Sequence, residues 1–150
     1  GYDLEGMSED DKNALLHAFE ETGERAVLLA VLGGAFSEGV DLPGSRLIGA
    51  IIIGVGLPGL SNERNIVRDY FDEDTGVGYD YAYTYPGMNN VLQAAGRVIR
   101  TDADRGVVVL VDDRYATPKY RELFPEHWKQ AQYAGNPKSL AEICRRFWNK

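Results

Sequence analysis

Three short apolar runs stand out in the alternation of hydrophobic and polar positions along the chain. They cover residues 26–32, 47–56 and 106–111, and the last two are rich in β-branched side chains. Runs of this length are too short for ordinary helices, and they are apolar at successive positions, so they predict buried strands. Strands of this kind belong in a mostly parallel sheet that is covered on both faces.

The segments around these runs have the periodicity of helices. One predicted helix ends near Gly23, and two more, around residues 62–73 and 88–100, separate the second run from the third. Residues 115–123 and 139–148 are predicted to be helical after the third run. Helices that alternate with buried strands predict an α/β fold with a mostly parallel β-sheet flanked by helices. With 150 residues, the chain is expected to form a single domain, residues 1–150, with its own core.

The sequence QAAGRVIR, residues 93–100, places polar side chains on one side of a predicted helix. At about 100° per residue, Gln93, Arg97 and Arg100 fall within a sector of roughly 60°. Arginine forks match phosphate oxygens, so this face is suited to a phosphate group, although a solvated helix face is the alternative. The opposite side of the same helix is apolar and is expected to be buried through Met88, Leu92, Ala95 and Ile99.

A glycine-rich loop, residues 33–46, follows the first predicted strand. Ligands of parallel sheets bind outside the carboxyl ends of strands, and glycines let backbone N–H groups approach a phosphate. Asp41 or Glu38 would be suited to a ribose hydroxyl or to a water near a metal, and Ser37 adds a hydroxyl. An ordinary glycine-rich connection is the alternative. The chain has no GxxxxGK[ST] sequence, so this loop is not a Walker A loop.

Tyrosines recur at every second position from Tyr79 to Tyr85. Such a stripe is suited to stacking on nucleic-acid bases, but it is also typical of a half-buried strand or extended loop, which we favour. Pro86 and Gly87 are expected to break the stretch before the helix begins.

The charge and the cysteine content narrow the function. A net charge of −7 argues against holding nucleic acid by bulk charge, so any such contact must be local. No apolar run is long enough for a membrane helix, and no leader opens the chain, which predicts a cytoplasmic protein without membrane association. Cys144 is the single cysteine, and the two histidines lie far apart, so no disulfide or metal site is expected.

Three segments together resemble a known family. AFSEGVDLPG, YPGMNNVLQAAGRVIR and DRGVVVLVDDRY are similar to the second RecA-like domain of superfamily 2 DNA helicases of the XPD/DinG-like type, over roughly residues 25–130. SEGVD corresponds to that family's motif V and QAAGRVIR to its motif VI. The residues that follow match in the same order, and they are Asp104, Gly106, Asp112 and Arg114.

The resemblance implies roles for the motif residues. In that family two RecA-like domains clamp ATP between them. Arg97 and Arg100 would then be the arginine fingers that act on the γ-phosphate, with Gln93 aiding phosphate contact. The motif V residues would be divided between the ligands, with Gly39 and Asp41 toward ATP and with Ser37 and Glu38 near the nucleic acid.

The resemblance also implies partners and a larger parent. The chain would be the second RecA-like domain, a fragment of an ATP-dependent DNA helicase that couples ATP hydrolysis to movement along single-stranded DNA. ATP and Mg²⁺ would be held mainly by the first domain, because the Walker A lysine and the Walker B acidic pair are absent here, and the isolated domain is expected to be inactive. Many family members carry an iron–sulfur cluster on four cysteines. This chain lacks such a set of cysteines, so the resemblance allows a cluster only in the rest of the parent protein.

Two other functions fit the same residues. In one, the chain is a non-catalytic, helicase-like interaction or scaffold domain whose arginines bind acidic groups. In the other, it is a stand-alone binder of single strands that uses Tyr79 to Tyr85.

Overall fold

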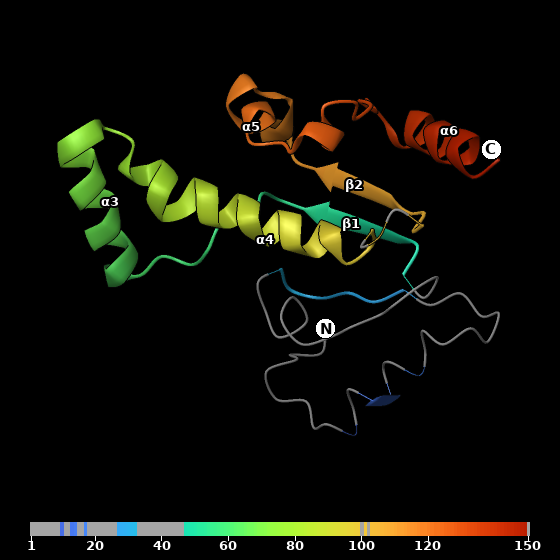
Figure 1. Ribbon diagram of the computed structural model, residues 1–150, viewed down its shortest axis with the longest axis horizontal. Coiled ribbons are helices and arrows are strands. Elements are labelled where there is room, and N and C mark those ends of the chain that lie inside the picture. The colour runs from blue at the N-terminus through green and yellow to red at the C-terminus, as the bar shows by residue number, and fades with distance from the viewer. Residues whose placement is uncertain are drawn as a thin grey trace. The chain divides into compact units, whose positions relative to one another are not determined.

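The computed structural model describes two compact units of the chain, Gly1–Asp112 and Asp113–Lys150 (Figure 1). Each unit is described here by itself, and the prediction that they form one domain stays a prediction. The described residues are 10, 13, 14, 17, 27–32, 47–99, 101 and 103–149. Residues 10, 13, 14 and 17 are helical and lie within the first predicted helix.

Among the described residues of the first unit, two strands form a parallel sheet. Strand β1, Gly49–Ile53, pairs with strand β2, Val107–Val111, in a register that aligns the two strands end to end. These strands confirm the second and third predicted strands and their parallel direction. β1 is shorter than predicted because Gly54 and Gly56 have φ values of 84° and 63°, a left-handed conformation that leaves the strand.

The two faces of β1 differ in exposure. Ile52 is 6% exposed, whereas Ile51 is 69% and Ile53 is 79% exposed. Successive side chains of a strand point to opposite faces, so one face of β1 is covered and the other is open. The prediction of a sheet covered on both faces is therefore wrong for β1.

The first apolar run takes no part in this sheet. Its described residues, 27–32, are not in a strand, and Val27, Leu29 and Val31 are 78 to 88% exposed. The prediction of a buried strand over 26–32 is wrong for these residues. An apolar run supplies the side chains of a strand, but a strand also needs a neighbouring backbone to complete its hydrogen bonds.

Helix α3, Asn62–Thr75, confirms the helix predicted around 62–73. It begins where the Ser61 hydroxyl accepts a hydrogen bond from the backbone N–H of Arg64, at 3.3 Å. It ends at Gly76, whose φ of 69° places it in the left-handed region typical of a helix terminus.

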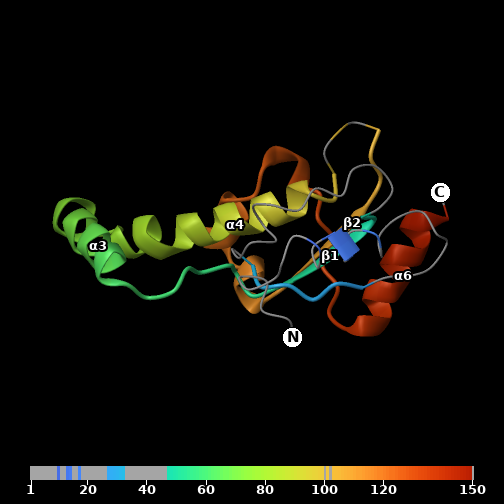
Figure 2. The same cartoon turned by 90° about the horizontal axis from the view of Figure 1, so that it is seen from below.

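The tyrosine segment is helical rather than extended. A π-helix, η3 at Asp80–Thr84, leads directly into helix α4 at Tyr85–Gly96 (Figure 2). The predicted break at Pro86 and Gly87 is wrong, because Pro86 lies in the first turn of α4, where a backbone N–H needs no acceptor within the helix. The predicted extended stretch over the tyrosines is wrong for the same segment.

The buried face of α4 packs against the end of β1. Val91 is fully buried, and Met88 and Ala95 are at most 4% exposed, as predicted for the last two. A side chain on Gly56 would come within 2.6 Å of the Gly87 carbonyl oxygen, so the two backbones touch. The core of this unit lies at that contact between helix and sheet.

The second unit is built from helices. It contains the 3₁₀ turns η4, Asp113–Ala116, and η5, Glu126–Trp128, with α5, Pro118–Glu122, between them, and it ends with α6, Pro137–Trp148. These helices confirm the ones predicted at 115–123 and 139–148. The segment YRELFPEHW supplies Tyr120, Phe124 and Trp128 to an aromatic cluster that Tyr115 of η4 completes. Neighbouring rings of this cluster lie 5.6 to 6.1 Å apart.

Within the described part of the chain, no helix is long and apolar enough to cross a membrane.

Candidate functional site

Helix α4 runs alongside the strands in the opposite direction (Figure 1). Its first turns touch the backbone just beyond the carboxyl end of β1. A Cβ atom added to Gly87 would lie only 2.7 Å from the Val55 carbonyl oxygen. Past its other end, Val98 is 2% exposed and packs so closely on Gly106 that a Cβ there would meet Val98 at 2.4 Å. The end of α4 therefore lies beside the start of β2.

Gln93 and Arg97 lie on one face of this helix end. They are four residues apart, and Arg97 keeps helical backbone angles as the C-cap of α4, so the two positions stay aligned. Gln93 is exposed, whereas Arg97 is half-buried with its Nε shielded from solvent. The structure thus brings together two of the three side chains predicted to share this face.

The helix ends four residues earlier than predicted. The N–H of Arg97 donates to the carbonyl oxygens of Ala94 and Ala95, a tightening typical of a last turn. Ile99 then lies outside the helix and is 49% exposed, so its predicted burial is wrong. Arg100 follows Ile99 directly and lies outside the described residues.

The short turn beyond α4 gives structural roles to two residues of the family resemblance, Asp104 and Gly106. The Asp104 carboxylate accepts a hydrogen bond from the Thr101 backbone N–H at 2.8 Å, and the Asp104 N–H donates to the Thr101 carbonyl oxygen at 3.1 Å. Gly106 leaves room for Val98 and for the Ile48 backbone. Both positions shape the connection from α4 to β2.

Asn90 is a residue that the sequence patterns did not single out. Its side-chain amide donates to the Gly56 carbonyl oxygen at 3.2 Å and so joins α4 to the end of β1. In the sequence, only a pair of asparagines inside an amphipathic helix could have pointed to it. In the structure Asn90 is half-buried and Asn89 is exposed. The pattern alone does not say which of the two has a partner.

The motif V residues cannot be placed in this site. Among the predicted site residues, those outside the described part of the chain are Ser37, Glu38, Gly39, Asp41 and Arg100. Their roles, and those of Gln93 and Arg97, stay predictions. Within the described residues, no group of three His, Cys, Asp or Glu side chains is placed to hold a metal ion.

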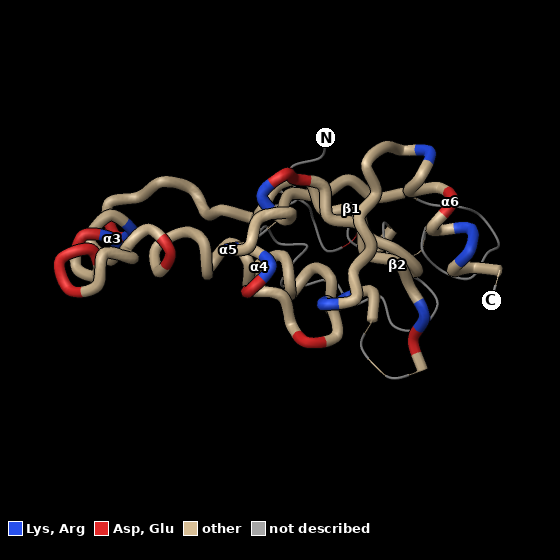
Figure 3. Tube along the Cα trace, turned by 90° about the horizontal axis from the view of Figure 1, so that it is seen from above, with Lys and Arg blue, Asp and Glu red and all other residues tan. Residues whose placement is uncertain are grey.

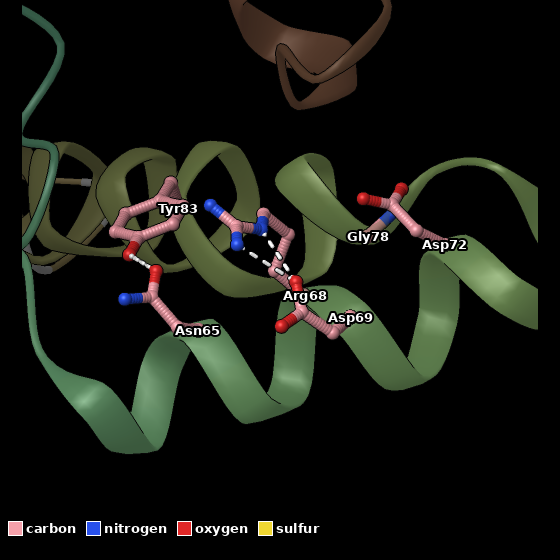
Figure 4. A network of polar contacts seen from close by, with 6 residues as sticks. All are labelled: Asn65, Arg68, Asp69, Asp72, Gly78 and Tyr83. Carbon is pink, nitrogen blue, oxygen red and sulfur yellow. Dashed lines mark hydrogen bonds and ion pairs between the residues drawn. The ribbon is translucent and has the colours of Figure 1, made fainter.

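The π-helix η3 forms the N-terminal end of the continuous helical segment that includes α4. Polar contacts hold α3 against η3 and the residues before it (Figure 4). The buried Tyr83 hydroxyl donates to the Asn65 side chain at 3.1 Å, and the Gly78 N–H donates to the Asp72 carboxylate at 2.7 Å. Tyr83 is therefore a structural residue, and the tyrosine stripe does not act as one surface.

Comparison with known proteins decides the family. The sequence model of the helicase C-terminal domain family matches residues 3–131 of the chain. The chain belongs to this family. The matched region contains β1, α4 and β2 with the QAAGRVIR segment, and the resemblance to XPD/DinG-like superfamily 2 helicases is thereby confirmed.

Relatives of this helicase C-terminal domain are helicases by name. The regulator of telomere elongation helicase 1 homolog of Caenorhabditis elegans is 36% identical over 134 residues, which cover 83% of this chain and 13% of that protein. The ATP-dependent DNA helicase CHL1 of Eremothecium gossypii is 30% identical over 83% of this chain and 17% of its own length. The general transcription and DNA repair factor IIH helicase subunit XPD of Dictyostelium discoideum is 29% identical over 71% of this chain and 14% of its own length. The chain thus spans less than a fifth of these relatives.

Proposed function

We propose that this helicase C-terminal domain is the second RecA-like motor domain of an ATP-dependent DNA helicase. In that protein it faces ATP that is held mainly by the first RecA-like domain. The observation that carries the proposal is the placement of Gln93 and Arg97 on one face of α4, within the family's QAAGRVIR segment. The opposite face of α4 is packed on a parallel sheet, so the helix is a rigid support for these side chains.

The chemistry follows from the arginine. A guanidinium group stays charged and donates up to five hydrogen bonds, which suits the oxygens of a γ-phosphate as negative charge develops on them. The partial burial of Arg97 lowers the competition from water and strengthens such a contact. Arginine fingers of this kind contribute about 10³ to 10⁵ in rate. In the proposal Arg100 is the second finger and Gln93 adds a neutral contact to phosphate.

The remaining partners are assigned by the family resemblance. In the proposal Gly39 and Asp41 would contact the nucleotide, and Ser37 and Glu38 would contact a single-stranded DNA backbone. The first domain supplies the Walker A and Walker B residues and with them the Mg²⁺ that accompanies ATP. The isolated chain therefore does not hydrolyse ATP.

The test is a substitution in the full-length protein. Arg97→Ala is expected to lower kcat of DNA-stimulated ATP hydrolysis by about 10³ or more, with unchanged circular dichroism of the isolated domain. Arg97→Lys keeps the charge but loses the planar fork, so it restores little activity. Arg105→Ala, at an exposed arginine in the next loop, is the matched control and keeps its activity. Full turnover in Arg97→Ala would favour a non-catalytic scaffold domain instead.

A further inference from the structure

Helix α3 contacts η3 and the residues before it partly through polar side chains. Arg64 donates to the Ala82 carbonyl oxygen. Asn65 accepts from Tyr83 and Asp72 accepts from the Gly78 N–H (Figure 4). A usual amphipathic helix makes such contacts with an apolar stripe. Of the apolar side chains of α3, only Phe71 is half-buried, and it stacks on Tyr81 of η3.

The exposed side of α3 carries apolar side chains among acidic ones. Ile66 is 69% exposed and Tyr70 is 68% exposed, and their spacing of four residues puts them on one face. Val67, beside them, is 40% exposed. Large exposed apolar side chains that gather on one face mark an interaction site more often than scattered ones do.

Aromatic rings extend this face from α3 onto η3 and α4. The ring of Tyr70 meets Phe71 edge to face, with centroids 5.2 Å apart, and Phe71 stacks on Tyr81 at 4.2 Å. Tyr81 in turn meets Tyr85 at 5.2 Å, and these two tyrosines are 44% and 37% exposed. We call this surface the arm face, and it consists of Ile66, Val67, Tyr70, Phe71, Tyr81 and Tyr85.

Several acidic residues lie on α3, the helix that carries part of the arm face (Figure 3). Asp69 is paired with Arg68, whose Nε and Nη2 donate to its carboxylate at 2.9 and 2.7 Å. Glu63, Glu73 and Asp74 add exposed negative charge to the same helix. The hydrogen bond of Glu63 with its own backbone, followed by that with Ser61, lowers the pKa of its carboxyl, which is therefore ionised at neutral pH.

We propose that the arm face is a docking surface for a basic amphipathic helix of a partner protein. Apolar side chains of that helix would cover the exposed rings, and its lysines or arginines would lie against Glu63, Glu73 and Asp74. A phosphate backbone would be repelled by the same carboxylates, although tyrosines can stack on bases. A second copy of this chain is also repelled, because each copy carries a net charge of −7.

The probe for this proposal is a synthetic helix of about 18 residues, five turns long, with leucines on one face and lysines on the other. It is titrated into the isotope-labelled chain of 150 residues while the amide resonances are followed by nuclear magnetic resonance. The expected result is saturable binding with the largest shifts in α3 and η3. The control peptide has glutamates in place of the lysines, and it is expected not to bind.

Substitutions on the arm face separate docking from mere attraction between opposite charges. Tyr70→Ser removes an exposed ring and is expected to weaken binding of the lysine peptide about tenfold. Tyr133→Ser changes an equally open tyrosine of the second unit, 79% exposed, and is expected to leave binding unchanged. The double change Glu73→Lys with Asp74→Lys should weaken binding most at low salt, whereas Glu122→Lys on α5 should not.

Four results would overturn the proposal. The lysine peptide could shift resonances outside α3 and η3, or Tyr70→Ser and Tyr133→Ser could have the same effect. A short oligothymidine could displace the peptide from the same amides, which would assign the face to single strands. Sedimentation could show that the unmodified chain dimerises and that Tyr70→Ser makes it monomeric, which would assign the face to self-association.

Discussion

The side-chain amide of Asn90 donates a hydrogen bond to the carbonyl oxygen of Gly56 across 3.2 Å. This bond joins the middle of α4 to the backbone just beyond β1, next to the contact between Gly56 and Gly87. Gln93 and Arg97 lie one and two turns further along the same helix. The position of Arg97 relative to the sheet therefore depends on contacts that Gly87 and Asn90 make in the first half of the helix.

Loss of this bond is expected to destabilise the chain. Asn90→Ala leaves the Gly56 carbonyl oxygen without this donor and should lower the free energy of unfolding by about 1 kcal/mol. Asn89→Ala is the control, since Asn89 is exposed and both changes gain the same helix propensity. Urea unfolding of the two variants measures the difference, and equal midpoints would show that the bond contributes nothing.

Two glycines of α4 offer a comparison within one helix. Gly87→Ala would place a Cβ 2.7 Å from the Val55 carbonyl oxygen, and backbone cannot move aside easily, so a loss of about 2 kcal/mol or more is expected. Gly96 has open space around it, so Gly96→Ala should be neutral or stabilising by up to about 1 kcal/mol. Thermal unfolding of both variants checks this order, and a stable Gly87→Ala variant would contradict the close contact.

The parts of the fold that the sequence predicted are those decided by local pattern. β1 and β2 follow from apolar runs rich in β-branched residues, and α3 follows from its helical periodicity. The run over 26–32 is also apolar, but its described residues do not join the sheet. Composition measures how apolar a segment is, whereas strand pairing depends on which backbone lies beside it.

The tyrosine stretch shows a second limit of pattern. A period of two favours an extended chain, yet residues 80–84 form a π-helix that continues into α4. Tertiary contacts override the local preference here, because Tyr83 is buried and bonded to Asn65, eighteen residues earlier. No alternation of side chains encodes a bond of that span.

The candidate site was predictable in part. The spacing of Gln93 and Arg97 indicated a shared face, and the structure has them on it. The helix wheel also included Ile99, but the helix ends at Gly96 and Ile99 is exposed, whereas Arg100 lies outside the described residues. The support that Asn90 gives to this face depends on a backbone oxygen of residue 56, which a helical pattern does not reveal.

The start of α3 should respond to pH. Hydrogen bonds lower the pKa of Glu63 in the folded chain, so its contribution to stability is present above the usual carboxyl pKa of about 4.3 and is lost as the pH falls below it. Glu63→Gln should therefore be less stable than the unmodified chain at about pH 7, and the difference should shrink as the pH falls through the lowered pKa of Glu63. Urea unfolding across this pH range measures the difference.

Ser61 provides the control for that prediction, because its hydroxyl caps the helix and bonds to Glu63. Ser61→Ala should cost about 1 kcal/mol, and Glu63→Gln should have a smaller effect in the Ser61→Ala background. Additive effects of the two changes would show that the pair does not act together.

If the full-length protein is the proposed helicase, Asn90 should act in it as a positioning residue for Arg97. Asn90→Ala lets α4 shift on the sheet, and a small displacement of a group that acts on the transition state lowers kcat with little change in KM. We expect kcat of ATP hydrolysis to fall about tenfold, whereas Asn89→Ala leaves it unchanged. In an Arg97→Ala background, Asn90→Ala should cause no further loss, because the group that it positions is gone.

These variants separate the positioning role of Asn90 from the proposed function of the domain. If Arg97→Ala abolishes turnover but Asn90→Ala does not lower it, the domain acts as proposed and the bond to Gly56 merely stabilises the fold. If Arg97→Ala leaves turnover intact, the arginine does not face ATP and the proposed function itself fails. A loss of kcat from Asn90→Ala that persists in the Arg97→Ala background would mean that Asn90 acts through the stability of α4 rather than through the arginine.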